Sequence, residues 1–410
     1  MKILKLQVVL FTYCRLVFNS AFRMIYAFLP IFGRALGVDL QSMSLALTAR
    51  SAVSSLGPFV ASVSDLRSRK FGMLLGMGLF SAGTALVVFF PTFPFFVISI
   101  IISTIGKYVF DPGMQAYLGD RIQYSQRGQL IAITEFGWSL AFILGVPSAG
   151  YLIARNGWIS PFKLFALLGF IGFLILIAGI PSEKHVKNGT SSMFRNFGTI
   201  FHSPPAIFAL GIGLFASTSN EMINLIFGVW LDDSLKSWLG PQGFEGLFKF
   251  LNFFKDSLGL DIALLILAAI VIGASELMAE GLVSRFVDRI GKPRAVAIGL
   301  IINSLAAMLL PAIGKTTTGA LIGLFLFFIS FEFTLVSLIT MMTEIQPKSR
   351  ATLMAFNVGA ISFGRAIGDL ISPYFYLNGL FFSGVSAVFF NLVAIVLLWQ
   401  SQKVESTIRS

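Results

Sequence analysis

Long apolar runs alternate with short polar segments along the whole chain. A helix needs about 20 mostly apolar residues to cross the hydrocarbon core of a bilayer. Several runs are rich in glycine and serine, which is typical of membrane helices that pack closely. The pattern predicts an all-α membrane protein with twelve transmembrane helices, at residues 7–32, 41–63, 71–91, 93–118, 128–153, 161–180, 205–231, 260–284, 294–313, 318–342, 350–374 and 378–400.

Two of the polar loops, 64–72 and 284–294, resemble each other, since each is short and basic and holds one aspartate. Asp65 and Asp288 are 223 residues apart, and three more pairs keep this offset: Gly76 with Gly299, Arg127 with Arg350, and Gly145 with Gly368. A shared offset over such a length indicates a tandem repeat. We therefore predict two pseudo-symmetric six-helix bundles, at 1–180 and 205–410, joined by a cytoplasmic linker at 181–204.

The repeated loop is similar to that of the major facilitator superfamily of transporters, which reads G-x-x-x-D-R-x-G-R-[K/R] after the second and eighth helices. The first copy here has Ala61, Asp65, Leu66, Ser68, Arg69 and Lys70, and the second has Ser284, Asp288, Arg289, Gly291 and Lys292. The resemblance implies two bundles that work by alternating access. It also implies a conformational latch made by Asp65, Arg69, Lys70, Asp288, Arg289 and Lys292. The alternative is that these charges only anchor the loops in water.

Composition and charge support a membrane protein. The chain is 56% hydrophobic and 12% charged, with a mean hydropathy of +0.85, which no soluble fold could bury. The net charge of +11 comes from loops: 18 of the 30 Lys and Arg lie at the termini and in the loops of one side, 7 on the other side and 5 within spans. This bias predicts a multi-pass protein of the inner cell membrane with both termini cytoplasmic, and it argues against a nucleic-acid partner.

Metal and cofactor chemistry have little support in the sequence. Cys14 is the single cysteine and lies in an apolar run, while His185 and His202 both fall in the central loop. We therefore expect no metal site, no cofactor and no catalytic residue. The segment 232–259 on the outer side mixes aromatic residues with lysines. It is interpreted as an interfacial hairpin inserted in the second bundle, with a lid over the outer mouth as the alternative.

Charged residues within the predicted spans are candidates for function, because each costs at least ~2.5 kcal/mol unless it faces a partner or a cavity. The first half holds Arg15, Arg23, Arg50, Lys107, Asp111 and Glu135, a net +2, and the second holds Glu221, Glu276, Glu332, Arg365 and Asp369, a net −3. Arg15 is expected to extend to the interface. The i, i+4 pairs Lys107–Asp111 and Arg365–Asp369 could be functional or could only neutralise each other.

The superfamily lines its cavity with the first, fourth, seventh and tenth helices. The resemblance therefore implies a substrate cavity with Arg23, Tyr26, Lys107, Asp111, Glu221 and Glu332, to which Arg50 is added by its position near mid-span. A carboxyl group in a low-dielectric environment can exchange a proton near neutral pH. Asp111, Glu221 and Glu332 are therefore the candidates for proton coupling.

The fifth predicted span contains Gly145, Pro147 and Gly150. This is similar to the motif G-P-x-x-G-G of drug:proton antiporters, with one residue inserted between the first Gly and Pro. These residues allow close packing and a bend near the outer end, although Gly and Pro are common in any membrane helix.

The sequence predicts a secondary transporter, because it has no phosphate-binding loop of the form G-x-x-x-x-G-K-[S/T]. The favoured function is proton-coupled efflux of small amphipathic molecules by a monomer, and the closest resemblance is to the antiporter group. The alternative is a proton-coupled symporter that imports a polar or zwitterionic solute. A polytopic membrane enzyme is the remote alternative, since neither a metal cluster nor a nucleophile constellation occurs.

Overall fold

The structure, a computed structural model, describes residues 2–60, 68–121, 133–181, 198, 200–238, 258–346 and 350–409. Every regular element in these ranges is a helix. Within the described residues, ten helices are long and apolar enough to cross a membrane. The two other predicted spans, 41–63 and 350–374, correspond to α3 (Leu40–Ser55) with α4 (Gly57–Val60), and to α18 (Arg350–Tyr376).

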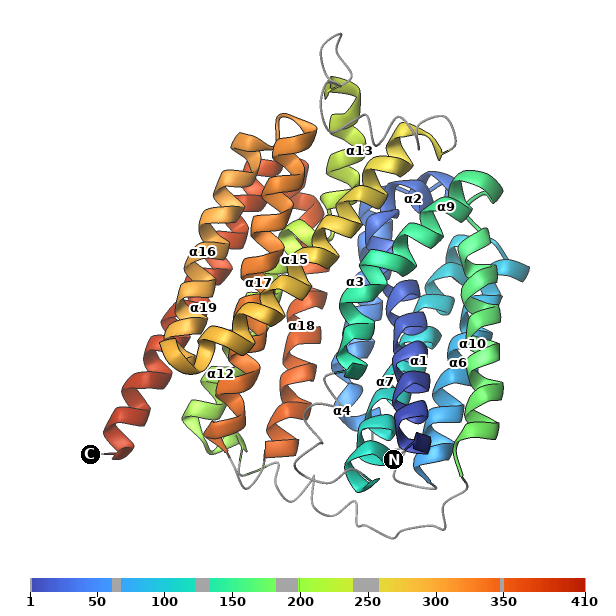
Figure 1. The fold of residues 1–410 in the computed structure, drawn as a ribbon. Helices are drawn as coiled ribbons and strands as arrows, with labels where there is room; N and C mark the ends of the chain where they lie inside the picture. The colour runs from blue at the N-terminus through green and yellow to red at the C-terminus, as the bar shows by residue number, and fades with distance from the viewer. Residues whose placement is uncertain are drawn as a thin grey trace. The chain divides into compact units, whose positions relative to one another are not determined.

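The chain folds into two compact units (Figure 1). Unit 1 contains the described residues within 1–39, 56–189 and 253–273. Its elements are α1 (Lys2–Ala27), α2 (Leu29–Leu36), α4, α6 (Arg69–Phe89), α7 (Phe93–Arg121), the π turn η1 (Ala141–Gly145), α9 (Val146–Asn156) and α10 (Ser160–Gly179). The η1 and α9 segments belong to one longer helical span, Ile133–Asn156.

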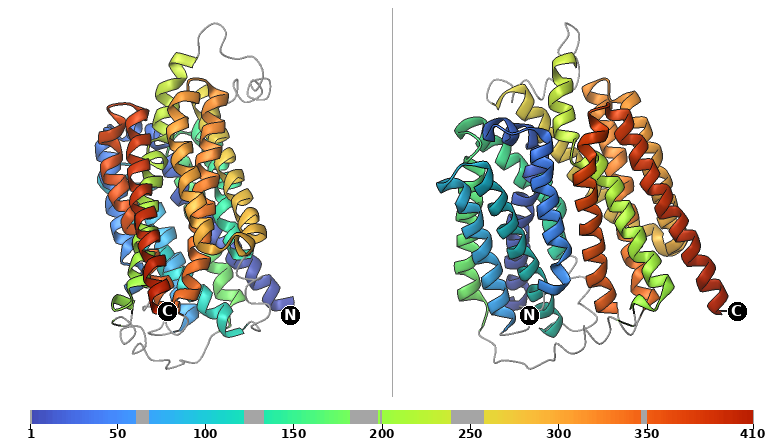
Figure 2. Two further views of the ribbon diagram at one scale, coloured as in Figure 1. Left: turned by 90° about the vertical axis from the view of Figure 1, so that its left-hand side faces the viewer. Right: turned by 180° about the vertical axis from the view of Figure 1, so that it is seen from behind.

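Unit 2 contains the described residues within 40–55, 190–252 and 274–410. Its elements are α3, α12 (Pro204–Asn224), α13 (Phe227–Trp238), α16 (Lys292–Ile313), α17 (Thr317–Ile345), α18 and α19 (Leu380–Arg409). Helix α15 (Leu260–Ile290) is divided between the units after Gly273. Within each unit the long helices run side by side (Figure 2).

The predicted boundaries of the two bundles and the predicted linker are not tested by this division. Most of the linker, and the insertion from 239 to 257, lie outside the described residues. Helix α3 lies between segments of unit 1 in the sequence, yet it packs in unit 2 against α18. This placement determines which residues form the charged cluster described below.

Glycines that share the 223-residue offset lie at close helix crossings. A Cβ on Gly76 of α6 would lie 2.5 Å from the carbonyl oxygen of Gly106 on α7. A Cβ on Gly299 of α16 would collide with Thr334 of α17. Corresponding glycines in the two halves of the sequence thus allow close packing of α6 on α7 and of α16 on α17.

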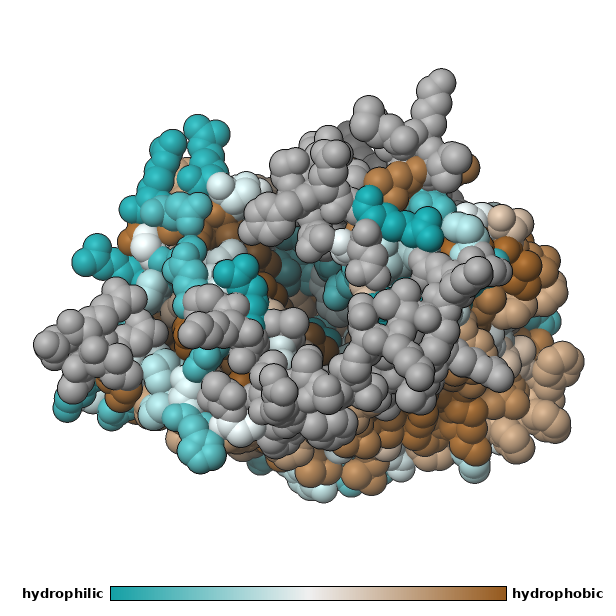
Figure 3. All heavy atoms as spheres, turned by 90° about the horizontal axis from the view of Figure 1, so that it is seen from below, coloured by the Kyte–Doolittle hydropathy of each residue, from teal (hydrophilic) through white to brown (hydrophobic). Residues whose placement is uncertain are grey.

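The outward surfaces of several helices are strongly apolar. On α10 the exposed side chains include Leu167, Phe170 and Leu174, and on α16 they include Ile301 and Leu305. Such continuous apolar faces are stable against lipid chains rather than water. In the view from below, apolar side chains cover the flank and hydrophilic ones gather at the end of the molecule (Figure 3). This surface is that of a membrane protein.

Candidate functional site

The first part of the site is a buried carboxylate in unit 2. Glu221 of α12 is 1% exposed. The Nδ2 of Asn224 donates a hydrogen bond of 2.7 Å to Glu221 Oε2, and Arg365 Nε of α18 lies 3.5 Å from Oε1. Gly368 allows this approach of α12 and α18, because a Cβ there would collide with Glu221. The predicted candidate Glu221 is therefore held by two polar partners on two helices.

Helix α3 completes this cluster from the other side. Asp369 of α18 is fully buried, and its Oδ2 accepts a hydrogen bond of 2.6 Å from Ser51 Oγ. Ser44 Oγ donates to the backbone oxygen of Asp369. Arg50, also fully buried, and Asp369 both act electrostatically on Glu221. The resulting cluster has two carboxylates and two guanidinium groups on three helices: Glu221, Asp369, Arg50 and Arg365.

A second charged cluster lies in unit 1. Lys107 Nζ and Asp111 Oδ2 on α7 are 2.6 Å apart, which realises the i, i+4 pair expected from the sequence. Arg15 Nε of α1 lies 3.6 Å from Asp111 Oδ1, and Arg15 Nη1 donates to Glu135 of the span Ile133–Asn156. The expectation that Arg15 extends to the interface is therefore wrong. Its side chain is buried because two carboxylates from two other helices compensate its charge.

Arg23 of α1 is held by aromatic rings. Its Cζ lies 3.6 Å from the ring centre of Phe142 and 4.3 Å from that of Trp138, while Nη1 donates to the Trp138 carbonyl oxygen at 3.1 Å. Tyr26, one turn later on α1, is also buried, and its ring centre is 6.1 Å from that of Phe22. Cation–π contacts of this kind stabilise a buried guanidinium. The predicted candidates Arg23 and Tyr26 therefore belong to one aromatic group in unit 1.

Glu332 of α17 is 7% exposed and lies between Phe331 and Phe333 in the sequence. Phe327 and Phe328, one turn earlier, are buried and form an edge-to-face pair with ring centres 5.4 Å apart. The second carboxylate candidate of unit 2 thus lies on an aromatic stretch of its helix.

The distribution of charge between the folded units differs from that between the sequence halves. Because α3 packs in unit 2, Arg50 counts with that unit. Unit 1 then has a net +1 from Arg15, Arg23, Lys107, Asp111 and Glu135, and unit 2 a net −2 from Arg50, Arg365, Glu221, Glu276, Glu332 and Asp369. The asymmetry is smaller than the +2 and −3 of the halves.

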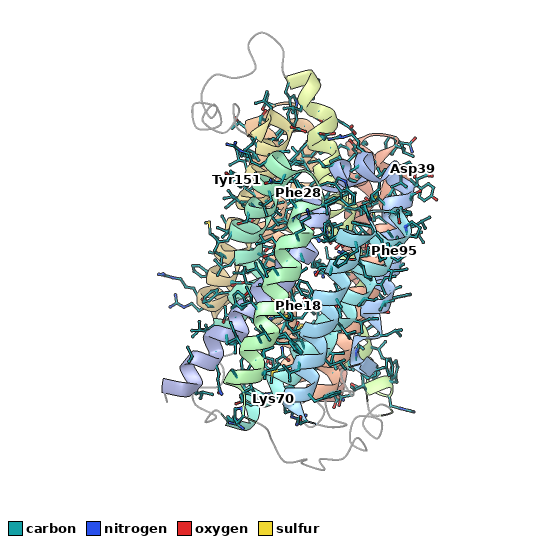
Figure 4. The ribbon with its side chains drawn as sticks, turned by 90° about the vertical axis from the view of Figure 1, so that its right-hand side faces the viewer. Phe18, Phe28, Asp39, Lys70, Phe95 and Tyr151 are labelled. Carbon is teal, nitrogen blue, oxygen red and sulfur yellow. The ribbon has the colours of Figure 1, made fainter. Side chains whose placement is uncertain are left out.

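Two lysines of the basic loops contact the ends of neighbouring helices, and the role of these loops as a latch stays a prediction. Lys70 at the lower end of unit 1 donates to the carbonyl oxygens of Ile177 and Ile180, at 2.7 Å and 2.5 Å, and so caps the end of α10 (Figure 4). Lys292 pairs with Glu344, and its Nζ lies 4.0 Å from Asp288 Oδ1.

The remaining residues of the predicted latch are divided between the described and undescribed parts of the chain. Arg69 is the first residue of α6, and Arg289 lies in the last turn of α15. Asp65 lies outside the described residues.

The glycines of the fifth span lie at close contacts within unit 1. Gly145 ends η1, and a Cβ on it would collide with Ser20 of α1. A Cβ on Gly150 of α9 would lie 2.6 Å from Cγ1 of Ile266 on α15 and 2.7 Å from Cζ of Phe28. Pro147 is the second residue of α9, directly after the π turn, so its missing N–H falls inside the continuous span Ile133–Asn156.

Comparison with known proteins identifies the family. Residues 12–368 match the Major Facilitator Superfamily. The chain belongs to this superfamily. As a Major Facilitator Superfamily protein it is a secondary transporter of small molecules that spans the lipid bilayer several times, and it is not an enzyme.

Two relatives from Bacillus subtilis match most of the chain. The chain is 23% identical to the uncharacterized MFS-type transporter YwfA of Bacillus subtilis over 356 residues, which are 86% of this chain and 81% of that protein. It is 22% identical to the uncharacterized MFS-type transporter YbcL of the same organism over 374 residues, 90% of this chain and 89% of the other.

Solved structures share the fold at low sequence identity. The nucleoside transporter NupG superposes with a TM-score of 0.71 at 15% identity, covering 98% of this chain and 98% of the other. A POT family transporter in complex with 5-aminolevulinic acid gives 0.74 at 13% identity, covering 98% and 96%. These likenesses concern the fold.

Sequence reasoning missed the uncharged members of the clusters. Ser44 and Ser51 are seven residues apart, two turns of helix, so they lie on the same face of α3 as a polar stripe. Asn224 follows Glu221 by three residues and therefore lies on the same face of α12. Polar residues at these spacings near an intramembrane charge were the available signal.

Proposed function

We propose that this transporter couples the entry of protons to the export of small amphipathic molecules, acting as a monomer in the inner cell membrane with both termini cytoplasmic. The observation that supports this proposal is the setting of Glu221, which is buried between Arg365 and Asn224 in a cluster with equal numbers of carboxylates and guanidinium groups.

A proton on Glu221 would change the balance of this cluster. Protonation removes the negative charge that faces Arg365, and a buried cation without its counter-charge is strongly destabilising. The side chains of α12, α18 and α3 then have to rearrange, or a transported group has to replace the lost charge. Proton binding would in this way be linked to helix packing, which alternating access requires.

Aromatic side chains near the candidate charges favour an amphipathic cargo. Glu332 lies on the phenylalanine-rich part of α17, and the group around Arg23 contains Phe22, Tyr26 and Trp138. Rings beside a carboxylate are a suitable surface for an organic cation. Asp111 is a weaker candidate for proton coupling than Glu221 or Glu332, because Arg15 and Lys107 both compensate it.

The second candidate function is proton-coupled import of a polar or zwitterionic solute. It is favoured by the same unit 2 cluster, because carboxylates and guanidinium groups that lie close together could bind the ammonium and carboxylate of one zwitterion.

The test uses purified protein in liposomes that contain a pH-sensitive dye. Lipophilic cations, sugars and amino acids are added in turn under an imposed pH gradient. Proton movement opposite to a lipophilic cation supports exchange, and movement in the same direction as an amino acid or sugar supports symport. A dye signal that does not respond to any compound contradicts proton coupling.

The matched variants are Glu221→Gln and Asp261→Asn. We expect Glu221→Gln to abolish proton movement, because the amide cannot exchange a proton. Asp261, at the start of α15, lies 3.9 Å from Arg34 and outside both clusters, so Asp261→Asn should keep the signal. Unchanged pH dependence in both Glu221→Gln and Glu332→Gln would remove these carboxylates from the coupling role.

A further inference from the structure

The fifth span contains one π turn, and its two ends are held by α1. At Ala141–Gly145 the helix widens so that the N–H of Val146 bonds to the carbonyl of Ala141, five residues earlier. A π turn of this kind accommodates one extra residue in an α-helix and is frequent at functional sites. The α1 residues that contact the turn belong, like the turn itself, to unit 1.

Asn19 holds the chain just before the π turn. Its Nδ2 donates a hydrogen bond of 3.1 Å to the carbonyl oxygen of Gly137, and Asn19 is fully buried. Arg23, one turn later on α1, donates to the next carbonyl, that of Trp138. At the far end of the turn, Gly145 lies against Ser20, whose position a Cβ on Gly145 would overlap.

The spacing of the two glycines explains why an extra residue is needed. A Cβ on Gly137 would lie 3.0 Å from Cβ of Arg15, so Gly137 and Gly145 both face α1 although they are eight residues apart. At 3.6 residues per turn, seven residues make about two turns and return to the same face. Since the π turn absorbs one residue, eight positions advance the helix by about two turns.

We propose that Asn19 is a positioning residue of the transporter, which stabilises the π turn and thereby sets the face that α9 presents to its neighbours. Beyond the turn, Gly150 meets Phe28 and Ile266 of the first half of α15. If the helix did not absorb the extra residue in a π turn, every residue after Gly145 would be rotated by about 100° relative to α1. The inference uses only contacts within unit 1 and does not depend on proton coupling.

Two single-residue deletions test whether the π turn holds an insertion. Leu144 within the turn is 52% exposed, and Leu167 in the regular helix α10 is 57% exposed. Deletion of Leu144 should convert the turn into regular α-helix and leave the flanking registers intact. The detergent-extracted protein should then elute from a size-exclusion column as a monodisperse peak. Deletion of Leu167 should abolish that peak, because Gly169, Gly172 and Leu176 lose their packed face. Equal loss in both deletions would overturn the proposal.

Asn19→Leu tests the role of the side chain, with Asn303→Leu as its control. Asn303 of α16 also donates to a helix carbonyl, that of Phe327, at 2.9 Å, but it lies in unit 2. Loss of one hydrogen bond should make the amides of 141–146 exchange with deuterium about ten-fold faster in Asn19→Leu. Asn303→Leu should leave these amides unchanged, and an unchanged rate in Asn19→Leu would overturn the proposal.

The two changes are then combined in a double-mutant cycle. In the full-length chain Asn19→Leu should lower the midpoint of thermal unfolding in detergent by about 2 °C to 4 °C. In the background that lacks Leu144 the drop should be smaller, because only the hydrogen bond to Gly137 is then lost and no π turn remains to be stabilised. Additive effects would mean that Asn19 only packs against its surroundings, which would overturn the positioning role.

Discussion

At the scale of single residues, the transporter compensates several buried charges with partners from other helices. Arg15 shows this most clearly, because its two carboxylates come from α7 and from the span Ile133–Asn156. The spacing along one helix predicted the pair Lys107–Asp111, but it could not predict Arg15 as a third member. Contacts between helices depend on how the spans are arranged, and a single sequence does not specify that arrangement.

Arg15→Met should therefore destabilise the protein. The substitution leaves Asp111 with Lys107 and removes the Arg15 partner of Glu135. Because the Glu135 side chain is 44% exposed and screened by solvent, the cost should lie below about 3–5 kcal/mol, the cost of breaking a fully buried pair. Arg155→Met, at an exposed position of α9, is the control and should change stability by less than about 0.5 kcal/mol. Thermal unfolding in detergent measures both, and equal stability of the two variants would contradict the role of Arg15.

At the scale of elements, the sequence predicted the helices better than their crossings. Ten described helices cover predicted spans, and several extend a few residues beyond them, because the thickness of the bilayer sets only the minimum length of an apolar span. The importance of Gly145 could be predicted from its motif, whereas the π turn before it could not. A π turn depends on the register between two helices, here between α1 and the fifth span, and this register becomes visible only when both are in place.

Gly145→Ala should destabilise the crossing of α1 with the fifth span. The added methyl group overlaps Ser20, and overpacking of this kind costs about 1–3 kcal/mol. Ser20→Gly in the same chain should restore most of the loss, since it removes the colliding atoms. Gly119→Ala on α7, where no atom lies within 4 Å of the added group, serves as the control. A Gly145→Ala protein with normal thermal unfolding would contradict this crossing.

At the scale of the whole molecule, the tandem repeat and the family could be predicted from the loops and their offset. The assignment of α3 to unit 2 could not, because Leu40–Ser55 is flanked in the sequence by segments of unit 1. Arg50, Ser44 and Ser51 of α3 can be assigned to the charged cluster only when their neighbours Asp369 and Glu221 are known.

The predicted latch belongs to the same scale, because it would act on the conformational cycle as a whole. Asp65→Asn should impair turnover while leaving membrane insertion and folding intact, since the loop lies outside the packed spans of the predicted topology. Transport rate and yield of folded protein, measured side by side in liposomes and in detergent, separate the two effects. Normal turnover in this variant would eliminate the latch.

The place of α3 also has a consequence for biogenesis. During synthesis Arg50 leaves the ribosome 319 residues before Asp369, its neighbour in the finished cluster. At about 5–20 residues per second this interval is on the order of 15 to 60 s. For that time the nascent span carries an arginine whose insertion costs ~2.5–3.5 kcal/mol and whose cluster lacks Asp369. The charge compensation of α3 by Asp369 is therefore complete only when the last third of the chain has been made.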